Sequence, residues 1–290
     1  MEPVVTVGLD GSPESVTAAH WAAGEARLRH VPLRLVHAWV MAPPATAGVQ
    51  DADVQDHWAT RIVRDAAKEL REDFPGLAIS EELVAKDPVE ALLAEAEHSQ
   101  VLALGSRGIG PMAHFFLGDI ALDVVSRAEQ PVVLVRGAER EAGEPLFPGG
   151  GNVVVALRLH GPSESLLEFA FEAARRRGAP VRALHSRALP PQAYAPWGVG
   201  PDAAKHLADD AREELKKALA PWQRKYPDVR VIEEVALESP ARAVVRAASG
   251  ADLLVMGRRR KSPAWSRRIG TVVHAAIHHA TCPVAVVPHD

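Results

Sequence analysis

The sequence lacks the features that mark secreted, membrane-bound or nucleic-acid-binding proteins. Its 290 residues include one cysteine, Cys282, so no disulfide can form within the chain and a reducing compartment is expected. No apolar run approaches the ~20 residues of a transmembrane helix. The formal net charge is −4, whereas a general nucleic-acid-binding protein is usually basic. These absences predict a cytoplasmic protein that has neither a membrane nor a nucleic acid as its partner.

Several catalytic and cofactor motifs are missing as well. There is no G-x4-G-K-[S/T] phosphate loop, and no Ser-His-Asp or Cys-His arrangement can be placed from the sequence. The run from Gly108 to Ala113 resembles a dinucleotide-binding fingerprint, but Pro111 interrupts it. His274 and His278 lie four residues apart on an expected helix, yet no third metal ligand is evident. We therefore predict no catalytic residue and no protein-bound metal.

Apolar segments alternate regularly with helical patterns in the first half of the chain. The expected strands cover residues 4–9, 33–39, 78–85, 101–104 and 132–135. The first expected helix has Ser12 as its N-cap and Pro13 at its first position, and it ends near His30. Five strands that alternate with four helices indicate right-handed βαβ units and a parallel sheet.

The second expected helix, residues 54–73, carries apolar residues at four-residue spacing, which predicts one buried stripe. Its members are Val54, Trp58, Ile62, Ala66 and Leu70.

The pattern then starts again after a linker. VVTVGLDGSPES, residues 4–15, lines up with VVALRLHGPSES, residues 154–165, at an offset of 150. Self-similarity over such a long period indicates two copies of one domain. We expect an N-terminal domain over residues 1–137, a linker over 138–151 and a C-terminal domain over 152–290.

Three glycines follow the fourth expected strand in a fixed spacing. Gly105, Gly108 and Gly118 form the pattern G-x2-G-x9-G, and a valine-rich strand follows. Glycines let backbone N–H groups approach an anion closely, and a helix that starts at Gly118 directs its positive end to the same place. The order of these features resembles the nucleotide-binding motif of the universal stress protein family, and the whole chain resembles its tandem, actinobacterial type.

The resemblance implies an α/β fold, with a Rossmann-like, five-stranded parallel sheet of order 3-2-1-4-5 in each domain, flanked by helices. It also implies adenine nucleotide, ATP or AMP, as ligand and a homodimer as the assembly. Gly8, Leu9 and Asp10 would border the ribose and adenine. Ala38 would touch the adenine ring, and Leu104 would close the base pocket.

The resemblance assigns the phosphates to the glycine-containing segment. Gly105, Arg107 and Gly108 would line the ribose and phosphates, and Gly118 with the N–H groups after it, up to Ile120, would hold the phosphate tail. Two structural alternatives stay open: the two glycines nearest the strand can be ordinary turn residues, and Asp10 can simply end the first strand.

Asp119 departs from the family motif, which has a hydroxyl residue there. A carboxylate beside a phosphate is unfavourable because like charges repel. Either Mg²⁺ bridges the two groups, or the site prefers AMP or a nucleoside, or Asp119 turns away to cap its own helix.

The corresponding site in the second half is degenerate in sequence. His160 aligns with Asp10 and Arg260 with Gly108, and the basic segment around them is either a solvated loop or an anion or partner surface. The residues assigned to this second site are His160, Gly257, Arg260, Gly270 and Thr271.

The expected function is an adenine-nucleotide-binding protein of stress response or signalling, with its ligand mainly in the N-terminal domain. One alternative is a scaffold that binds no nucleotide and acts through dimer surfaces. Another is a slow ATP hydrolase, for which Asp119 is the one acid expected near the phosphates.

Overall fold

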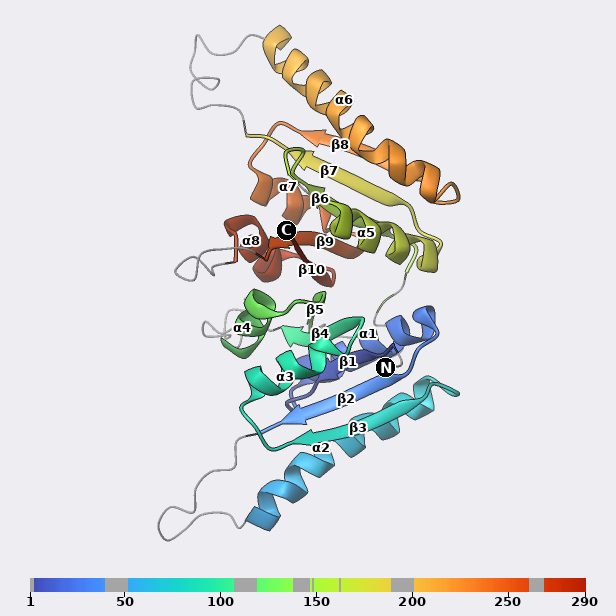
Figure 1. Cartoon of the computed structure of the whole chain (residues 1–290), viewed down its shortest axis with the longest axis vertical. Helices are drawn as coiled ribbons and strands as arrows, with labels where there is room; N and C mark the ends of the chain where they lie inside the picture. Colours follow the sequence, from blue (N-terminus) through green and yellow to red (C-terminus); the bar gives the residue numbers. More distant parts are fainter. Residues whose placement is uncertain are drawn as a thin grey trace. The chain divides into compact units, whose positions relative to one another are not determined.

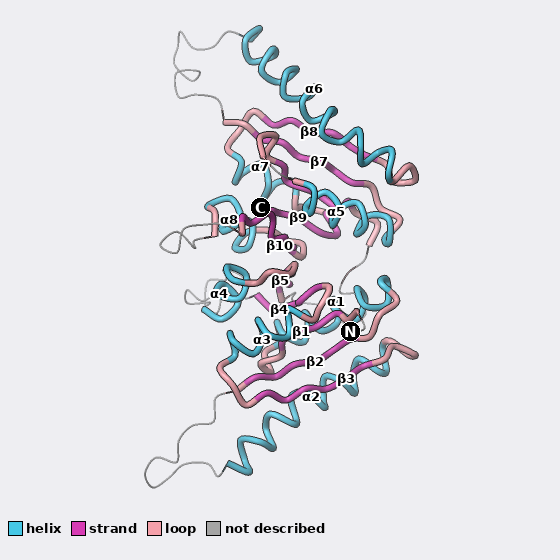
Figure 2. The backbone as a smooth tube through the Cα atoms, in the orientation of Figure 1, coloured by secondary structure: helices cyan, strands magenta, loops and turns pink. Residues whose placement is uncertain are grey.

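The computed structural model describes residues 3–39, 52–106, 119–137, 147, 149–161, 163–188, 201–260 and 269–290. The chain divides into two compact units, residues 1–148 and 149–290. In both units helices alternate with strands along the chain, as Figure 2 shows. None of the helices in the described ranges combines the length and the apolar character needed to cross a membrane.

The first unit contains one parallel sheet. Its neighbouring strands are paired in the order β3-β2-β1-β4-β5, and every pairing is parallel (Figure 1). The elements are β1 (Val5–Gly8), α1 (Pro13–Arg29), β2 (Leu33–Ala38), α2 (Ala52–Asp73), β3 (Ile79–Val84), α3 (Pro88–Glu97), β4 (Val101–Ser106), α4 (Asp119–Arg127) and β5 (Val132–Arg136).

The second unit repeats this topology. Its strands are paired in parallel in the order β8-β7-β6-β9-β10. The elements are β6 (Asn152–Leu157), α5 (Glu164–Arg177), β7 (Val181–Ser186), α6 (Pro201–Lys225), β8 (Val231–Ala236), α7 (Pro240–Ala247), β9 (Ala251–Arg259), α8 (Thr271–His279) and β10 (Val284–His289). The predicted fold class, two tandem α/β domains, is confirmed.

Helices pair with each other on each side of the first sheet. Helix α1 packs against α2, and α3 packs against α4. Right-handed crossovers place the first pair on one face and the second pair on the other. The central strands are therefore covered on both faces, and Val5, Leu102 and Val133 are completely buried.

Helix α1 begins and ends at the positions that its sequence predicts. The N-cap Ser12 accepts a hydrogen bond from the N–H of Ser15, and Pro13 is the first helical residue. The helix ends at His30, which has the left-handed conformation with φ 56°. Helix α5 ends in the same way at Gly178, with φ 63°.

The apolar stripe predicted for α2 is partly wrong. Ala66 and Leu70 are buried, but Trp58 is 53% exposed. An α-helix has 3.6 residues per turn, so a row with a strict spacing of four drifts around the helix and leaves the contact face. The side chain of Val54 lies outside the described residues.

Candidate functional site

The carboxyl ends of β1 and β4 lie side by side in the first unit. Gly8 pairs with Leu104 on one side and with Val36 on the other. The chain leaves β1 toward β2 but leaves β4 toward β5, so the direction of winding reverses between these two strands. In open parallel sheets this reversal opens a crevice for ligands.

Five of the predicted residues lie together at the carboxyl ends of these two strands: Gly8, Leu9, Asp10, Leu104 and Gly105. Leu9 and Leu104 are each 5% exposed, whereas Asp10 is exposed. Ala38 lies at the end of β2 and is half-buried.

Asp10 closes the turn that starts α1. Its Oδ1 accepts hydrogen bonds from the N–H of Ser12, at 2.9 Å, and from the Ser12 hydroxyl, at 2.5 Å. The same hydroxyl oxygen accepts the N–H of Ser15 at 3.2 Å. Asp10 therefore has a structural role in the turn, in addition to its position at the carboxyl end of β1.

Gly105 lets a helix approach a strand with backbone against backbone. A Cβ added to Gly105 would lie 2.7 Å from the carbonyl carbon of Glu14 and 2.7 Å from the nitrogen of Ser15. Neither backbone atom can rotate away, so no residue larger than glycine fits without a shift. The contact holds the first turn of α1 against the end of β4, beside the crevice.

The phosphate side of the predicted site lies mostly outside the described residues. Arg107, Gly108 and Gly118 belong to that segment. Asp119 is the first residue of α4, and Ile120, which follows it, is 42% exposed. A helix therefore starts immediately after Gly118, where the glycine motif predicts one.

Comparison with known proteins decides the family. The family model described as "Universal stress protein family" matches residues 3–136 and 151–288. The chain belongs to the universal stress protein family. A universal stress protein of Mycobacterium tuberculosis strain H37Rv is 32% identical over 293 residues, with 97% of this chain and 96% of that protein covered. One from Mycolicibacterium smegmatis is 30% identical over 296 residues, which cover 98% and 96% of the two chains.

A solved structure supports the fold. The crystal structure of a universal stress protein from Archaeoglobus fulgidus has a TM-score of 0.69 and 18% sequence identity, and the match covers 99% of this chain and 98% of the other.

Strand register corrects the assignment of His160 in the second half of this universal stress protein. His37 donates from Nδ1 to the carbonyl of Leu9 at 2.8 Å, and His185 contacts the carbonyl of Leu157 in the same way at 3.1 Å. Leu157 thus corresponds to Leu9, a numbering shift of 148 rather than 150. The residue at the position of Asp10 is therefore Arg158, and the prediction of His160 there is wrong.

Helix α5 also starts later than α1. The left-handed caps His30 and Gly178 correspond with the same shift of 148, which places Glu164, the first residue of α5, at the position of Val16. Helix α5 therefore begins after the position of the turn that α1 packs against Gly105.

The other residues predicted for the second site also have surroundings of their own. A Cβ added to Gly257 would meet the ring of His289 at 2.7 Å, not a helix backbone. Gly270 is the N-cap of α8 and Thr271 its first residue, and both are exposed. Arg260 is exposed, and its N–H donates to the carbonyl of His289 at 2.7 Å.

The remaining candidates behave as packing or surface groups. Cys282 is buried, and burial raises the pKa of its thiol to about 12. The Nε2 atoms of His274 and His278 lie 3.2 Å apart. Among the described residues, no third histidine, cysteine or carboxylate joins this pair to form a metal-binding group.

Two features were missed by sequence reasoning. A cavity of about 230 Å³ lies between α1 and α2, lined in part by Leu9, Trp58 and Arg61. The Arg61 guanidinium lies 5.4 Å from the centre of the Trp58 ring. Trp58 was the one sequence signal for this cavity. The four-residue row predicted that Trp58 was buried, so the signal was missed. The second feature is a contact between two acids of α2, Glu69 and Asp73, and His20 of α1.

Proposed function

We propose that this universal stress protein binds an adenine nucleotide, AMP or ATP, in its N-terminal half and acts in cytoplasmic stress response or signalling without rapid turnover. The observation that carries the proposal is the reversal of the winding direction between the ends of β1 and β4, where open parallel sheets bind ligands. Gly105 lets the first turn of α1 lie directly against the end of β4, and Asp10 is exposed at the end of β1.

The differences between the two halves support a single nucleotide site. In the first half the first turn of α1 reaches the end of β4, and the positive end of a helix favours a nearby anion. In the second half Arg158 replaces the acid, and α5 begins one turn later. We therefore propose that the ligand occupies the N-terminal site and that Arg158 and Arg260 have another use.

The test is nucleotide titration of the full chain by calorimetry, with ATP and with AMP, in the presence and absence of Mg²⁺. One nucleotide per chain is expected. Gly118→Ala should weaken binding at least tenfold, because the Cβ comes between the phosphate and the backbone N–H groups. The matched control is Gly270→Ala, because an added Cβ at this glycine would have open space within 4 Å.

Two results would count against the proposal. Equal weakening by both variants would place nucleotide in both halves. No heat, together with no thermal shift by ATP or AMP with Mg²⁺, would favour the scaffold that acts through dimer surfaces. We also propose that two chains form a homodimer, which light scattering on a sizing column would detect as a mass near twice 31.1 kDa.

A further inference from the structure

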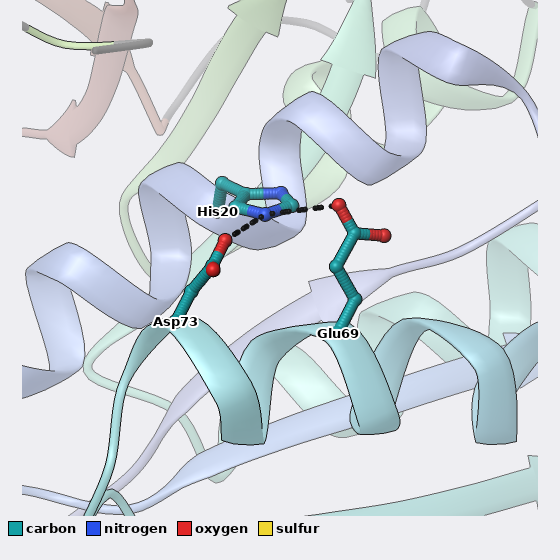
Figure 3. Close-up of side chains that lie close together, drawn as sticks. All are labelled: His20, Glu69 and Asp73. Atoms are coloured by element: carbon teal, nitrogen blue, oxygen red, sulfur yellow. Dashed lines mark hydrogen bonds and ion pairs between the residues drawn. The ribbon is translucent and has the colours of Figure 1, made fainter. Parts of the chain in front are cut away.

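One histidine and two acids from two helices form a compact group on the first unit, here named the His20 cluster. His20 projects from α1, and Glu69 and Asp73 lie one turn apart on α2 (Figure 3). The Nε2 atom of His20 lies 3.1 Å from Oδ2 of Asp73 and 3.4 Å from Oε1 of Glu69. Within the described ranges, no other set of three such groups brings its ligand atoms within 4.8 Å of one another.

The hydrogen bond of Nδ1 shows which tautomer a neutral His20 ring adopts. Nδ1 lies 3.0 Å from the carbonyl oxygen of Val16, which can only accept a hydrogen bond. Nδ1 therefore carries a proton, and a neutral ring presents the lone pair of Nε2 to the two carboxylates. His20 is only 8% exposed, whereas the two acids that face it are largely exposed to water. At these separations the nitrogen and the carboxylate oxygens share a cation, which is either a proton on Nε2 or a metal ion.

The geometry points to a divalent transition-metal site in the His20 cluster, with Nε2 of His20 and one oxygen each of Glu69 and Asp73 as ligands. A proton on Nε2 would bring one positive charge to two negative ones, whereas a dication balances both. Tetrahedral ligands at ~2.0–2.1 Å from zinc lie ~3.3 Å from one another, close to the 3.1 and 3.4 Å separations in the His20 cluster.

The chemistry of the three ligands narrows the metal. An imidazole nitrogen with two carboxylates suits Zn²⁺, Co²⁺ or Mn²⁺, whereas Ca²⁺ and Mg²⁺ prefer oxygen ligands alone. The hydrogen bond from Nδ1 to a backbone carbonyl is the support that a metal-binding histidine usually has. The side chains of Glu69 and Asp73 are each 56% exposed, which leaves a fourth position open to water.

The second unit provides an internal comparison. The ends of α2 and α6 correspond through Phe74 and Tyr226, because each donates its N–H four residues back and accepts the N–H three residues ahead. This correspondence, a shift of 152, places Lys225 at the position of Asp73.

In the second unit the same two helices are joined by a cation that the chain itself supplies. Glu168, which takes the place of His20 on α5, accepts a hydrogen bond from Lys225 on α6 at 2.7 Å. This hydrogen bond raises the pKa of Lys225. Pro221 takes the place of Glu69, so this unit has one acid and one ammonium. In the first unit the two corresponding positions on α2, Glu69 and Asp73, are both acids, so α2 supplies no cation at this place.

The experiment uses the full chain, freed of metal with EDTA, desalted and titrated with Zn²⁺ by calorimetry, and with Co²⁺ by visible absorption. Both titrations are also run on Asp73→Asn and Glu69→Gln, which keep the size of each side chain. The wild-type protein should bind Zn²⁺ at this site and show cobalt bands of tetrahedral type. Each variant should lose at least tenfold in affinity and lose those bands.

Two controls separate the His20 cluster from other sites. Glu168→Gln makes the same acid-to-amide change in the second unit, and His278→Asn removes the other close histidine pair. Both should keep the affinity and the cobalt spectrum. Circular dichroism checks that all variants are folded. Zinc binding that is absent from the wild-type protein, or equal in the wild type and Asp73→Asn, would overturn the metal site and leave an imidazolium ion pair.

Discussion

Gly105 at the end of β4 touches the backbone of Glu14 in the first turn of α1, and a Cβ there would lie 2.7 Å from its carbonyl carbon. The contact joins two segments far apart in the sequence beside the crevice. Its tightness has a direct energetic consequence.

Gly105→Ala should lower the free energy of unfolding by about 1–3 kcal/mol, because the added methyl group overpacks a contact between two backbones. Urea unfolding followed by circular dichroism measures the change. Gly24→Ala is the control: Gly24 lies within α1 with no atom within 4 Å of an added Cβ. It should raise stability by about 0.4–1 kcal/mol. Loss of stability in both variants would show that α1 tolerates no added methyl group.

Ser12→Ala should cost about 1 kcal/mol of stability, because the N-cap hydroxyl accepts the Ser15 N–H and also donates to Asp10. Ser163→Ala is the matched change in the second unit, where the N-cap serine makes no side-chain capping bond. Thermal melts of both variants give the comparison. A loss at Ser163 as large as at Ser12 would contradict the assigned cap.

Asp119→Ser should strengthen ATP binding about fivefold, because it removes a negative charge worth roughly 1 kcal/mol at contact distance in water. The gain should be smaller for AMP, and ATP binding should depend less on Mg²⁺. Asp123→Ser, an exposed acid one turn further along α4, serves as the control. Calorimetry that finds equal gains for ATP and AMP would show that Asp119 faces away from the phosphate tail.

Cys282 should resist alkylation in the folded protein. Burial raises the pKa of its thiol from 9.0 to about 12, so almost no thiolate exists at pH 8. Because the folded state holds this proton more tightly, the thiol's contribution to stability is present below pH 9 and is lost as the pH rises toward 12. Mass spectrometry after iodoacetamide treatment should show modification in urea only. Rapid labelling without urea would mean that the thiol is accessible.

Much of the fold could be predicted from short local patterns. The apolar runs at 101–104 and 132–135 identified β4 and β5, and Ser12 with Pro13 identified the start of α1. These signals work because a buried parallel strand and a capped helix each depend on neighbours in sequence.

The errors concern distances along the chain or around a helix. Matching letters put His160 opposite Asp10, but hydrogen-bond register, which letters do not encode, puts Arg158 there. His20 was missed because its acids follow about 50 residues later on α2, where acidic residues usually indicate a solvated face. No local pattern reports which helix will pack against which.

His30 and Gly178 end corresponding helices in the same left-handed conformation, yet only one of them is glycine. The two halves thus end the same helix with different residues, and the residue of one half can be substituted into the other. The substitution His30→Gly places a glycine in the left-handed conformation, which glycine adopts without steric cost. The pairs of positions at which the two backbones agree form a ready set of substitutions for protein engineering, each already present once in the chain.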